Sequence, residues 1–234
     1  MSTIAFVTHS GAPYLTDDDQ LTAHILQDTY GIRVRHLPWD DPGQDPSEFD
    51  LLVIRSTWNY YRKYEQFKRW LQNLDNKNIP VLNPVPLILW NSNKYYLSEL
   101  QQQGFPVAET RWLSQGSAVD LHKLIRQMEY RQTVLKPAVS AGAWHTWRIP
   151  AEEAHHYQPT ADEILSVTDA MLQPFYDEII ETGEYSLTYL GACYSHTTLK
   201  KPKNGDYRVQ REHGGPYVAA EPNKEWIDLG YSLI

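Results

Sequence analysis

Charged side chains recur at the ends of apolar segments in the second half of this 234-residue sequence. The stretch Thr133–Thr146, TVLKPAVSAGAWHT, places Lys136 in an apolar run and follows it with small residues. A lysine in such a run is costly to bury without a partner. It could supply a point charge for a phosphate, under a loop whose backbone N–H groups approach the oxygens. The same sequence is also compatible with a lysine at a strand end that reaches water, followed by an ordinary turn.

Two later positions carry groups suited to a nucleoside. Gln173-Pro174-Phe175 ends an apolar segment, where Pro174 interrupts the hydrogen-bond ladder of a strand. Backbone groups exposed at such a point can read the edge of an adenine. Glu184 opens a predicted hairpin, and its carboxylate can accept hydrogen bonds from ribose hydroxyls.

More cations stand at the ends of predicted elements. Lys94 begins a predicted helix, and Lys200 ends the return strand of the hairpin. The segment Gly205–Gly215, GDYRVQREHGG, adds Arg208, Gln210 and a Gly-Gly turn. Neither GxxxxGK[ST] nor GxGxxG occurs in the sequence, so a phosphate ligand would need a different cradle.

In the first half, Arg55–Tyr61, RSTWNYY, follows a strand of the buried type. Ligands of open sheets lie beyond the carboxyl ends of the strands. Arg55 could therefore bind a substrate carboxylate, with Trp58 and Tyr60 as walls. The alternative places Arg55 in a surface ion pair and Trp58 at a domain junction. The segment His9–Pro13 ends the first strand and is better explained as a plain turn.

Residues 1–85 follow the order strand, helix, strand, strand, helix, strand, which predicts an open and mainly parallel sheet. Thr16 is expected to cap the first helix and Gly31 to end it, while the acidic run Asp17–Asp19 suits its positive end. The expected strands are 3–8, 32–37, 50–56 and 79–84, and the expected helices are 16–31 and 63–74.

The second half is predicted to differ, with antiparallel strands. Alternation on both sides of Gly191-Ala192 indicates a hairpin over residues 184–201. Asn83–Pro86, NPVP, is a candidate linker. The remaining expectations are helices from about Asn93 to Gly104 and over 118–130, a strand through Lys136, a polar loop from Ala161, an apolar strand at Ala170–Phe175, and the start of a helix near Ile234.

Composition narrows the class of protein. The chain is 41% hydrophobic, enough for a sizeable core, and its net charge is −8. The acidic balance argues against a nucleic-acid partner. Cys193 is the single cysteine, so an internal disulfide is excluded. No apolar run approaches the roughly 18 residues of a membrane helix, and the start is not a signal peptide. A soluble cytoplasmic protein without a membrane partner is expected.

Taken in order, these motifs resemble the ATP-grasp superfamily. The matching series is Lys94, the Lys136 strand with its small-residue loop, QPF, GE-S, SH…K and DYRVQ…GG. The similarity is greatest to the RimK-like and glutathione-synthetase-like ligases, and among them to the D-cycloserine-forming type. LLVIRSTWNYY and WDDP in the first half resemble that group too. The resemblance implies a Rossmann-like domain over 1–85 and an ATP-grasp fold with subdomains at 86–172 and 173–234, the last truncated.

The resemblance also implies roles for residues. ATP is expected between two α+β subdomains, and Arg208 is expected to stabilise charge on the transferred phosphoryl group, with Lys200 reaching the phosphates. The expected ATP contacts are Lys94, Lys136, Ser140, Ala141, Gly142, Ala143, Gln173, Pro174, Phe175, Tyr176, Glu184 and Lys200. The expected substrate contacts are Arg55, Trp58, Tyr60 and Gln210.

The implied activity is an ATP-dependent ligase that activates a carboxylate as an acylphosphate, which an amine or related nucleophile attacks. The substrate is expected to be a small amino-acid-like molecule, and a homodimer is suggested by analogy alone. Such ligases use Mg²⁺, whose expected ligands would lie beyond Ile234, so no metal residue is assigned. The alternative is a degenerate or truncated nucleotide-binding module without catalysis.

Three other features are expected to be structural. His145, His196 and His213 have spacings that match no metal motif. Cys193 lies on an alternating strand and is predicted to be buried. Asp17–Asp19 resembles a metal cluster but is explained more simply by the helix end.

Overall fold

The computed structural model describes residues 2–234, which form two compact units. Unit 1 contains the chain up to Ala118 and the returning segments 137–141 and 162–171. Unit 2 contains residues 119–136, 142–161 and 172–234. The division into domains at residues 85 and 172 stays a prediction.

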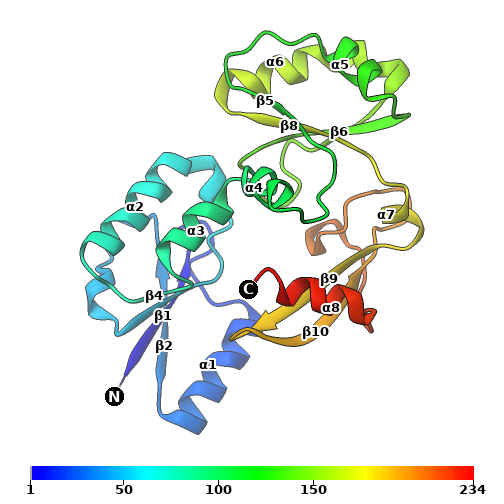
Figure 1. The fold of residues 1–234 in the computed structure, drawn as a ribbon. Coiled ribbons are helices and arrows are strands. Elements are labelled where there is room, and N and C mark those ends of the chain that lie inside the picture. The colour runs from blue at the N-terminus through cyan, green and yellow to red at the C-terminus, as the bar shows by residue number, and fades with distance from the viewer. Residues whose placement is uncertain (1) are drawn as a thin grey trace. The chain divides into compact units, whose positions relative to one another are not determined.

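Unit 1 is built on a parallel sheet. Its strands are β1 (Thr3–Thr8), β2 (Arg33–Pro38), β3 (Leu51–Ile54) and β4 (Val81–Leu82), in the order β2-β1-β3-β4 (Figure 1). The pairs β1–β2, β1–β3 and β3–β4 are all parallel. The predicted open parallel sheet is therefore confirmed.

The helices of unit 1 begin and end largely where the sequence indicates. In α1 (Asp17–Tyr30), the Thr16 hydroxyl accepts from the Asp19 N–H, and Gly31 adopts a left-handed φ of 66°. The other helices are α2 (Tyr64–Asn76), α3 (Val85–Ser92), α4 (Tyr96–Gln102) and the short 3₁₀ turns η1 (Pro46–Glu48) and η2 (Tyr60–Lys63).

One face of the sheet packs against α2 and α3. Phe67 and Leu71 of α2 and Val85 of α3 are buried in one cluster with Ala5, Leu52 and other strand residues. Burial of such apolar side chains contributes about 1.5–3 kcal/mol each. The linker expected at Asn83–Pro86 is wrong, because Val85 already begins α3. Proline is tolerated in the first turn of a helix, where its missing N–H has no partner to lose.

A second sheet has the strand order β5-β8-β6-β7. Its strands are β5 (Arg111–Leu113), β6 (Gln132–Pro137), β7 (Trp147–Pro150) and β8 (Ala170–Pro174), with α5 (Leu121–Met128), η3 (Ala151–Tyr157) and α6 (Gln158–Val167) in the connections. The pair β6 and β7 is antiparallel, and Lys136 lies near the end of β6. The polar loop expected from Ala161 is wrong, because ADEILSV completes α6, with Ile164 and Leu165 buried.

The third sheet is antiparallel, with the order β11-β10-β9. The strands β9 (Glu184–Leu190) and β10 (Cys193–Lys200) form the predicted hairpin, and β11 (Tyr217–Ala220) pairs with β10. Gly191 and Ala192 both have positive φ, as a two-residue turn of the primed type requires. The elements α7 (Glu178–Glu181) and η4 (Arg211–His213) complete the loops.

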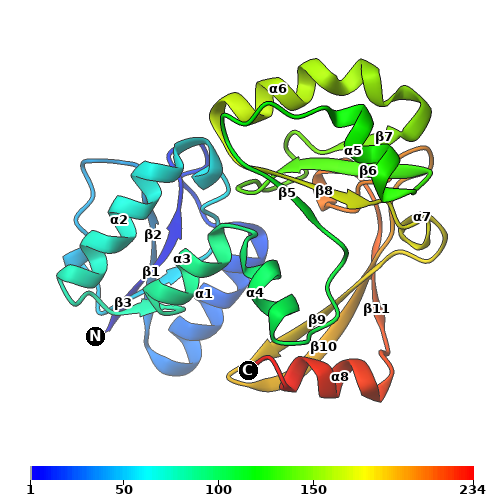
Figure 2. The same cartoon turned by 45° about the horizontal axis from the view of Figure 1, so that its top comes forward.

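Helix α8 (Lys224–Tyr231) packs on this hairpin, as both ribbon views show (Figure 2). The Tyr189 hydroxyl donates to the Ile227 carbonyl at 2.8 Å. A Cβ atom on Gly230 would clash with the Tyr189 ring and hydroxyl, so a side chain at this position would displace Tyr189. Cys193 is exposed at the tip of the hairpin, so its predicted burial is wrong. Among residues 2–234, no helix is long and apolar enough to cross a membrane.

Candidate functional site

In unit 1, the structure brings together two predicted phosphate residues, Lys94 and Ser140. The Lys94 ammonium donates to the Ser140 carbonyl at 2.8 Å and to its hydroxyl at 2.9 Å. The Lys94 backbone N–H donates to the Ala138 carbonyl at 2.9 Å. Lys94 precedes α4, which starts at Tyr96, so the lysine lies in a loop rather than in the helix. Ala141 follows Ser140 in the same unit.

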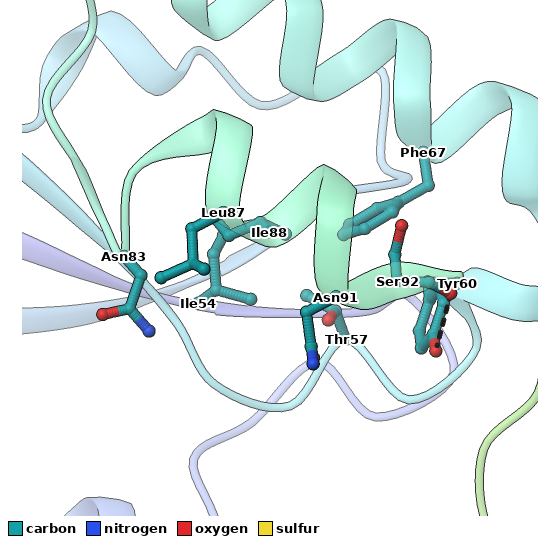
Figure 3. Close-up of a pocket in the computed structure, with 9 residues that line it drawn as sticks. All are labelled: Ile54, Thr57, Tyr60, Phe67, Asn83, Leu87, Ile88, Asn91 and Ser92. Atoms are coloured by element: carbon teal, nitrogen blue, oxygen red, sulfur yellow. Dashed lines mark hydrogen bonds between the residues drawn. The ribbon is translucent and has the colours of Figure 1, made fainter. Parts of the chain in front are cut away.

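Tyr60 lies beside this pair. Its hydroxyl is 3.5 Å from the carbonyl oxygens of Ser140 and Ser92. Burial, followed by the nearby Tyr64 and Tyr96, raises the pKa of Tyr60 to about 12, so the phenol stays protonated. Tyr60 also lines a pocket of about 420 Å³ within unit 1 (Figure 3).

The other two predicted substrate residues of unit 1 do not line this pocket. The Arg55 guanidinium donates to Oδ1 of Asp19 through Nε at 2.7 Å and Nη2 at 2.6 Å. Asp19 is buried, and the Arg55 side chain keeps 44% of its surface exposed. Trp58 is 57% exposed and has its ring near that of His9. An ion pair was the alternative weighed for Arg55, and the structure supplies its partner.

A buried carboxylate connects the loops after β1, β2 and β3. Asp40 accepts from the Ser10 N–H at 2.7 Å and the Ser10 hydroxyl at 2.9 Å. It also accepts from the Asn59 amide and the Lys63 ammonium, each at 2.8 Å. Burial raises the pKa of Asp40, but the bonds from Lys63, Ser10 and Asn59 outweigh it and hold that pKa well below its usual range. Sequence reasoning missed this hub, because its donors lie 19–30 residues away.

In unit 2, Glu184 and Lys200 lie opposite each other on β9 and β10. The Lys200 ammonium is 3.0 Å from Oε1 of Glu184. Lys136 of β6 is partly buried, and within residues 2–234 its ammonium makes no hydrogen bond or ion pair. The loss of hydration lowers the pKa of Lys136, while the charge of Glu184 acts in the opposite direction.

Arg208 is held by a neighbour two residues away. Its Nε and Nη2 donate to both carboxylate oxygens of Asp206, at 2.8–3.2 Å. Asp206 also accepts from the backbone N–H groups of Tyr207 and Arg208. The Arg208 bonds are the largest cause that keeps the pKa of Asp206 below its usual range. The guanidinium is therefore fixed in a fork geometry with part of its surface still exposed.

The predicted hinge residues Gln173–Tyr176 comprise the end of β8 and the two residues after it. Gln173 is buried, Pro174 ends the strand, and Tyr176 is 45% exposed. The Phe175 ring lies under the Arg148 guanidinium, 4.0 Å from its carbon, and meets the Tyr207 ring edge to face at 5.9 Å. The Tyr207 hydroxyl donates to the Thr146 carbonyl at 2.8 Å. Tyr207 thus ties the hinge, the Arg208 segment and the end of the small-residue loop together.

That loop continues in unit 2 with Gly142 and Ala143, whose φ values are 58° and 55°. A Cβ atom on Gly142 would lie 2.7 Å from Oε1 of Glu212, so a side chain cannot replace this glycine without a shift. Nearby in sequence, Oε1 of Gln210 and Nε2 of His213 are buried without a partner in the described chain.

Comparisons with known proteins agree with this architecture. Residues 4–83 match the family model described as the N-terminal domain of D-cycloserine synthetase DcsG. The cycloserine biosynthesis protein DcsG of Streptomyces lavendulae is 29% identical over 178 residues, which cover 74% of this chain and 58% of that protein. The chain therefore matches less than two thirds of that relative's length.

Two solved structures extend the comparison to the fold. The crystal structure of D-cycloserine synthetase DcsG aligns with a TM-score of 0.83 and 23% identity over 99% of this chain and 79% of that one. D-alanine–D-alanine ligase from Bacillus anthracis, complexed with ATP, aligns with a TM-score of 0.67 and 10% identity, over 99% and 75% of the two chains. The chain has an ATP-grasp fold.

Magnesium is the metal expected with an ATP-grasp fold. Across residues 2–234, no group of three or more His, Cys, Asp or Glu side chains could hold a metal ion. Two acidic residues of the candidate site are already bonded: Asp206 to Arg208, and Glu184 to Lys200. The residues described here do not fit a magnesium site, and none is assigned to that role.

Two residues of the candidate site escaped sequence reasoning. Tyr207 stood inside the recognised DYRVQ segment, but nothing in the letters showed that its hydroxyl reaches Thr146. Arg148 carried no signal, because its contact joins β7 to Phe175, the residue after β8, and the two are distant in sequence. Both act on a predicted ATP residue through a side-chain contact.

Proposed function

We propose that this chain is the nucleotide-binding part of an ATP-dependent ligase that joins a small carboxylate to an amine or related nucleophile. The carboxylate would be activated as an acylphosphate before the nucleophile attacks. The observation that carries the proposal is Lys136, a partly buried cation to which residues 2–234 supply no hydrogen-bond acceptor. It lies on the strand that precedes the small-residue loop of an ATP-grasp fold.

Three lysines are proposed to contact the phosphates of ATP. Lys136 and Lys200 of unit 2 and Lys94 of unit 1 are proposed to hold the phosphate oxygens, because a polyanion can replace the hydration that a partly buried ammonium has lost. The carbonyl and hydroxyl of Ser140 now accept from Lys94. A phosphate would compete with Ser140 for the Lys94 ammonium. The loop that begins at Ser140 would then move with the released serine.

The nucleoside would be held by the hinge and by Glu184. Residues Gln173–Tyr176 are proposed to lie beside adenine, with Phe175 fixed between Arg148 and Tyr207. The bonds from Lys200 and Ser186 both go to Oε1 of Glu184, so Oε2 is left to accept from ribose hydroxyls. Arg208, held by Asp206, is proposed to stabilise charge on the transferred phosphoryl group.

The proposed substrate side is less complete. Tyr60 lines the pocket of unit 1, and Gln210 has a buried carbonyl oxygen without a partner. Arg55 and Trp58 stay in the proposal as outer residues of the substrate side. A small amino-acid-like molecule fits the volume of the pocket. The cytoplasmic location and the homodimer also remain part of the proposal.

A second function, nucleotide binding without catalysis, is favoured by one observation. Residues 2–234 contain no acidic cluster suited to the metal that phosphoryl transfer uses. The two functions share the ATP site and differ only in turnover.

The deciding experiment measures ATP binding by calorimetry and ADP release with a panel of D- and L-amino acids, with Mg²⁺ present. Binding together with amino-acid-dependent ADP release supports the ligase. ATP binding without ADP release in the presence of any of the amino acids supports the nucleotide-binding module. Absence of ATP binding at millimolar concentration contradicts both.

A further inference from the structure

The pocket of unit 1 has a distinctive chemistry. Its volume is about 420 Å³, and nine residues line it: Ile54, Thr57, Tyr60, Phe67, Asn83, Leu87, Ile88, Asn91 and Ser92. None of these side chains carries a charge at neutral pH. Tyr60 is the one that ionises most readily, and its pKa of about 12 keeps it neutral. The lining can therefore pair with hydrogen-bonding groups but cannot neutralise an ion.

The lining has an apolar wall and a polar side (Figure 3). Ile54 from β3 and Leu87 and Ile88 from α3 form the aliphatic wall. Thr57, Asn83 and Asn91 supply hydroxyl and amide groups, and within residues 2–234 these side chains make no hydrogen bonds. An amide both donates and accepts, so this side suits a ligand group that does the same.

The pocket also has a direction. Figure 3 shows Asn83 at one end and Tyr60 with Ser92 at the other, with the aliphatic residues between them. The Tyr60 hydroxyl lies 3.5 Å from the Ser140 carbonyl, to which the Lys94 ammonium donates at 2.8 Å. The Tyr60 end therefore adjoins the cation that is proposed to meet phosphate, and the Asn83 end lies away from it.

We propose that this pocket binds the uncharged, hydrogen-bonding head of the small-molecule substrate, with its aliphatic body on Ile54, Leu87 and Ile88. That the ligand is the substrate rests on the proposed ligase function; the preference for a neutral head rests on the lining alone. A carboxylate or ammonium in this place would lose hydration without a counter-charge. The reacting end of the substrate would then point toward Tyr60 and Lys94.

Three fragments with the same number of carbon atoms test the charge preference. Isovaleramide, isovalerate and isoamylamine share a branched aliphatic body and differ in the charge of the head. Binding to the full chain without ATP is followed by protein-observed NMR. Isovaleramide should shift the signals of Thr57, Asn83 and Asn91, with an affinity at least about tenfold above that of either ion. Equal or tighter binding of isovalerate would overturn the proposal, as would shifts confined to other residues.

A charge placed in the pocket should reverse this order. Asn91 is exposed, so Asn91→Asp should fold normally, and the new carboxylate should make isoamylamine the favoured fragment. Gln72→Glu on the exposed surface of α2 makes the same charge change outside the pocket and should leave the order intact. If Asn91→Asp and Gln72→Glu behave alike, the pocket does not select by charge.

The fragment experiment and the ligase experiment fail separately. If isovaleramide is not preferred but amino-acid-dependent ADP release is observed, the pocket assignment is wrong and the ligase stands. If isovaleramide is preferred but ATP does not bind, the ligase is wrong and the neutral pocket stands.

Discussion

The two units use charge in opposite ways. Unit 1 buries the carboxylates of Asp19 and Asp40 and pairs each with a cation, Arg55 and Lys63. Unit 2 partly buries a cation instead, Lys136, for which the described part of the chain supplies no hydrogen-bond acceptor. A charge that already has its partners contributes to the fold, whereas a charge that has lost water without gaining a partner is suited to a ligand. The difference predicts that mutations in the two units separate stability from binding.

The largest expected effect is on stability, from Asp40→Ala in unit 1. The Asp40 side chain is 0% exposed, and its loss leaves Ser10, Asn59 and Lys63 without their acceptor. We expect a loss of about 3 kcal/mol in the free energy of unfolding, measured by urea denaturation. ATP affinity of the folded protein should not change.

The matched control is Asp28→Ala on the exposed face of α1, which should cost less than about 0.5 kcal/mol. Equal losses in the two variants would show that the Asp40 hub does not stabilise unit 1.

Lys136→Ala should have the reverse signature. Removing a cation that contacts phosphate should weaken ATP binding by about 2 kcal/mol, roughly thirtyfold in Kd, measured by calorimetry. The free energy of unfolding should stay the same or rise slightly, because a partly dehydrated ammonium is removed. Lys123→Ala, an exposed lysine of α5, is the control and should leave both quantities unchanged. Unchanged ATP affinity in Lys136→Ala would contradict the proposed nucleotide site.

A smaller effect is expected from Tyr207→Phe, which keeps the ring against Phe175 and removes one hydrogen bond to Thr146. Without this hydrogen bond, the ordered conformation of the small-residue loop should be about 1 kcal/mol less stable. ATP affinity should fall roughly fivefold as a result. Faster amide exchange in residues 142–146 would distinguish a loosened loop from a general loss of stability. Tyr30→Phe, at an exposed tyrosine of α1, is the control and should change neither the amide exchange of residues 142–146 nor the ATP affinity. Normal exchange and normal ATP affinity would show that the hydroxyl does not hold the loop.

Local patterns were sufficient for much of the fold. The Thr16 cap, the Gly31 end and the Gly191-Ala192 turn are each specified by a few adjacent residues, and all three were predicted. The helix α3 was missed because Pro84 and Pro86 suggested a linker, although proline is compatible with a first helical turn. The exposure of Cys193 was missed because alternation along an edge hairpin does not show which face is covered.

The candidate site was less predictable, because its contacts join distant residues. The residue types and the order of the motifs predicted ATP contacts at Lys94, Lys136, Glu184 and Lys200. The spacing alone did not show that Lys94 donates a hydrogen bond to Ser140, 46 residues away. The partner of Arg55 was equally hidden, since Asp19 lies 36 residues earlier in a run that looked like a simple helix end. Side-chain pairing over such distances depends on the packed sheet and not on local propensity.

The smallest expected effect is on the pH dependence of folding stability, and it again differs between the two units. The pKa values of Asp40 and Asp206 are both held below their ordinary value of 3.8, so each carboxylate stabilises the fold fully above that pH and loses this contribution as the pH falls from 3.8 through the lowered pKa of the folded state. The Asp206–Arg208 pair is partly exposed, so its share should be under about 1 kcal/mol. Thermal unfolding of the wild type and Asp206→Asn at pH 7 and pH 3 should show a small gap that narrows at pH 3 without closing, because closure requires a pH below the lowered pKa of the folded state. The gap to Asp40→Asn should be larger at pH 7 and narrow over the same range. An Asp206→Asn gap that widens in acid would mean that the carboxylate does not stabilise unit 2, and that Arg208 is positioned by something other than its neighbour.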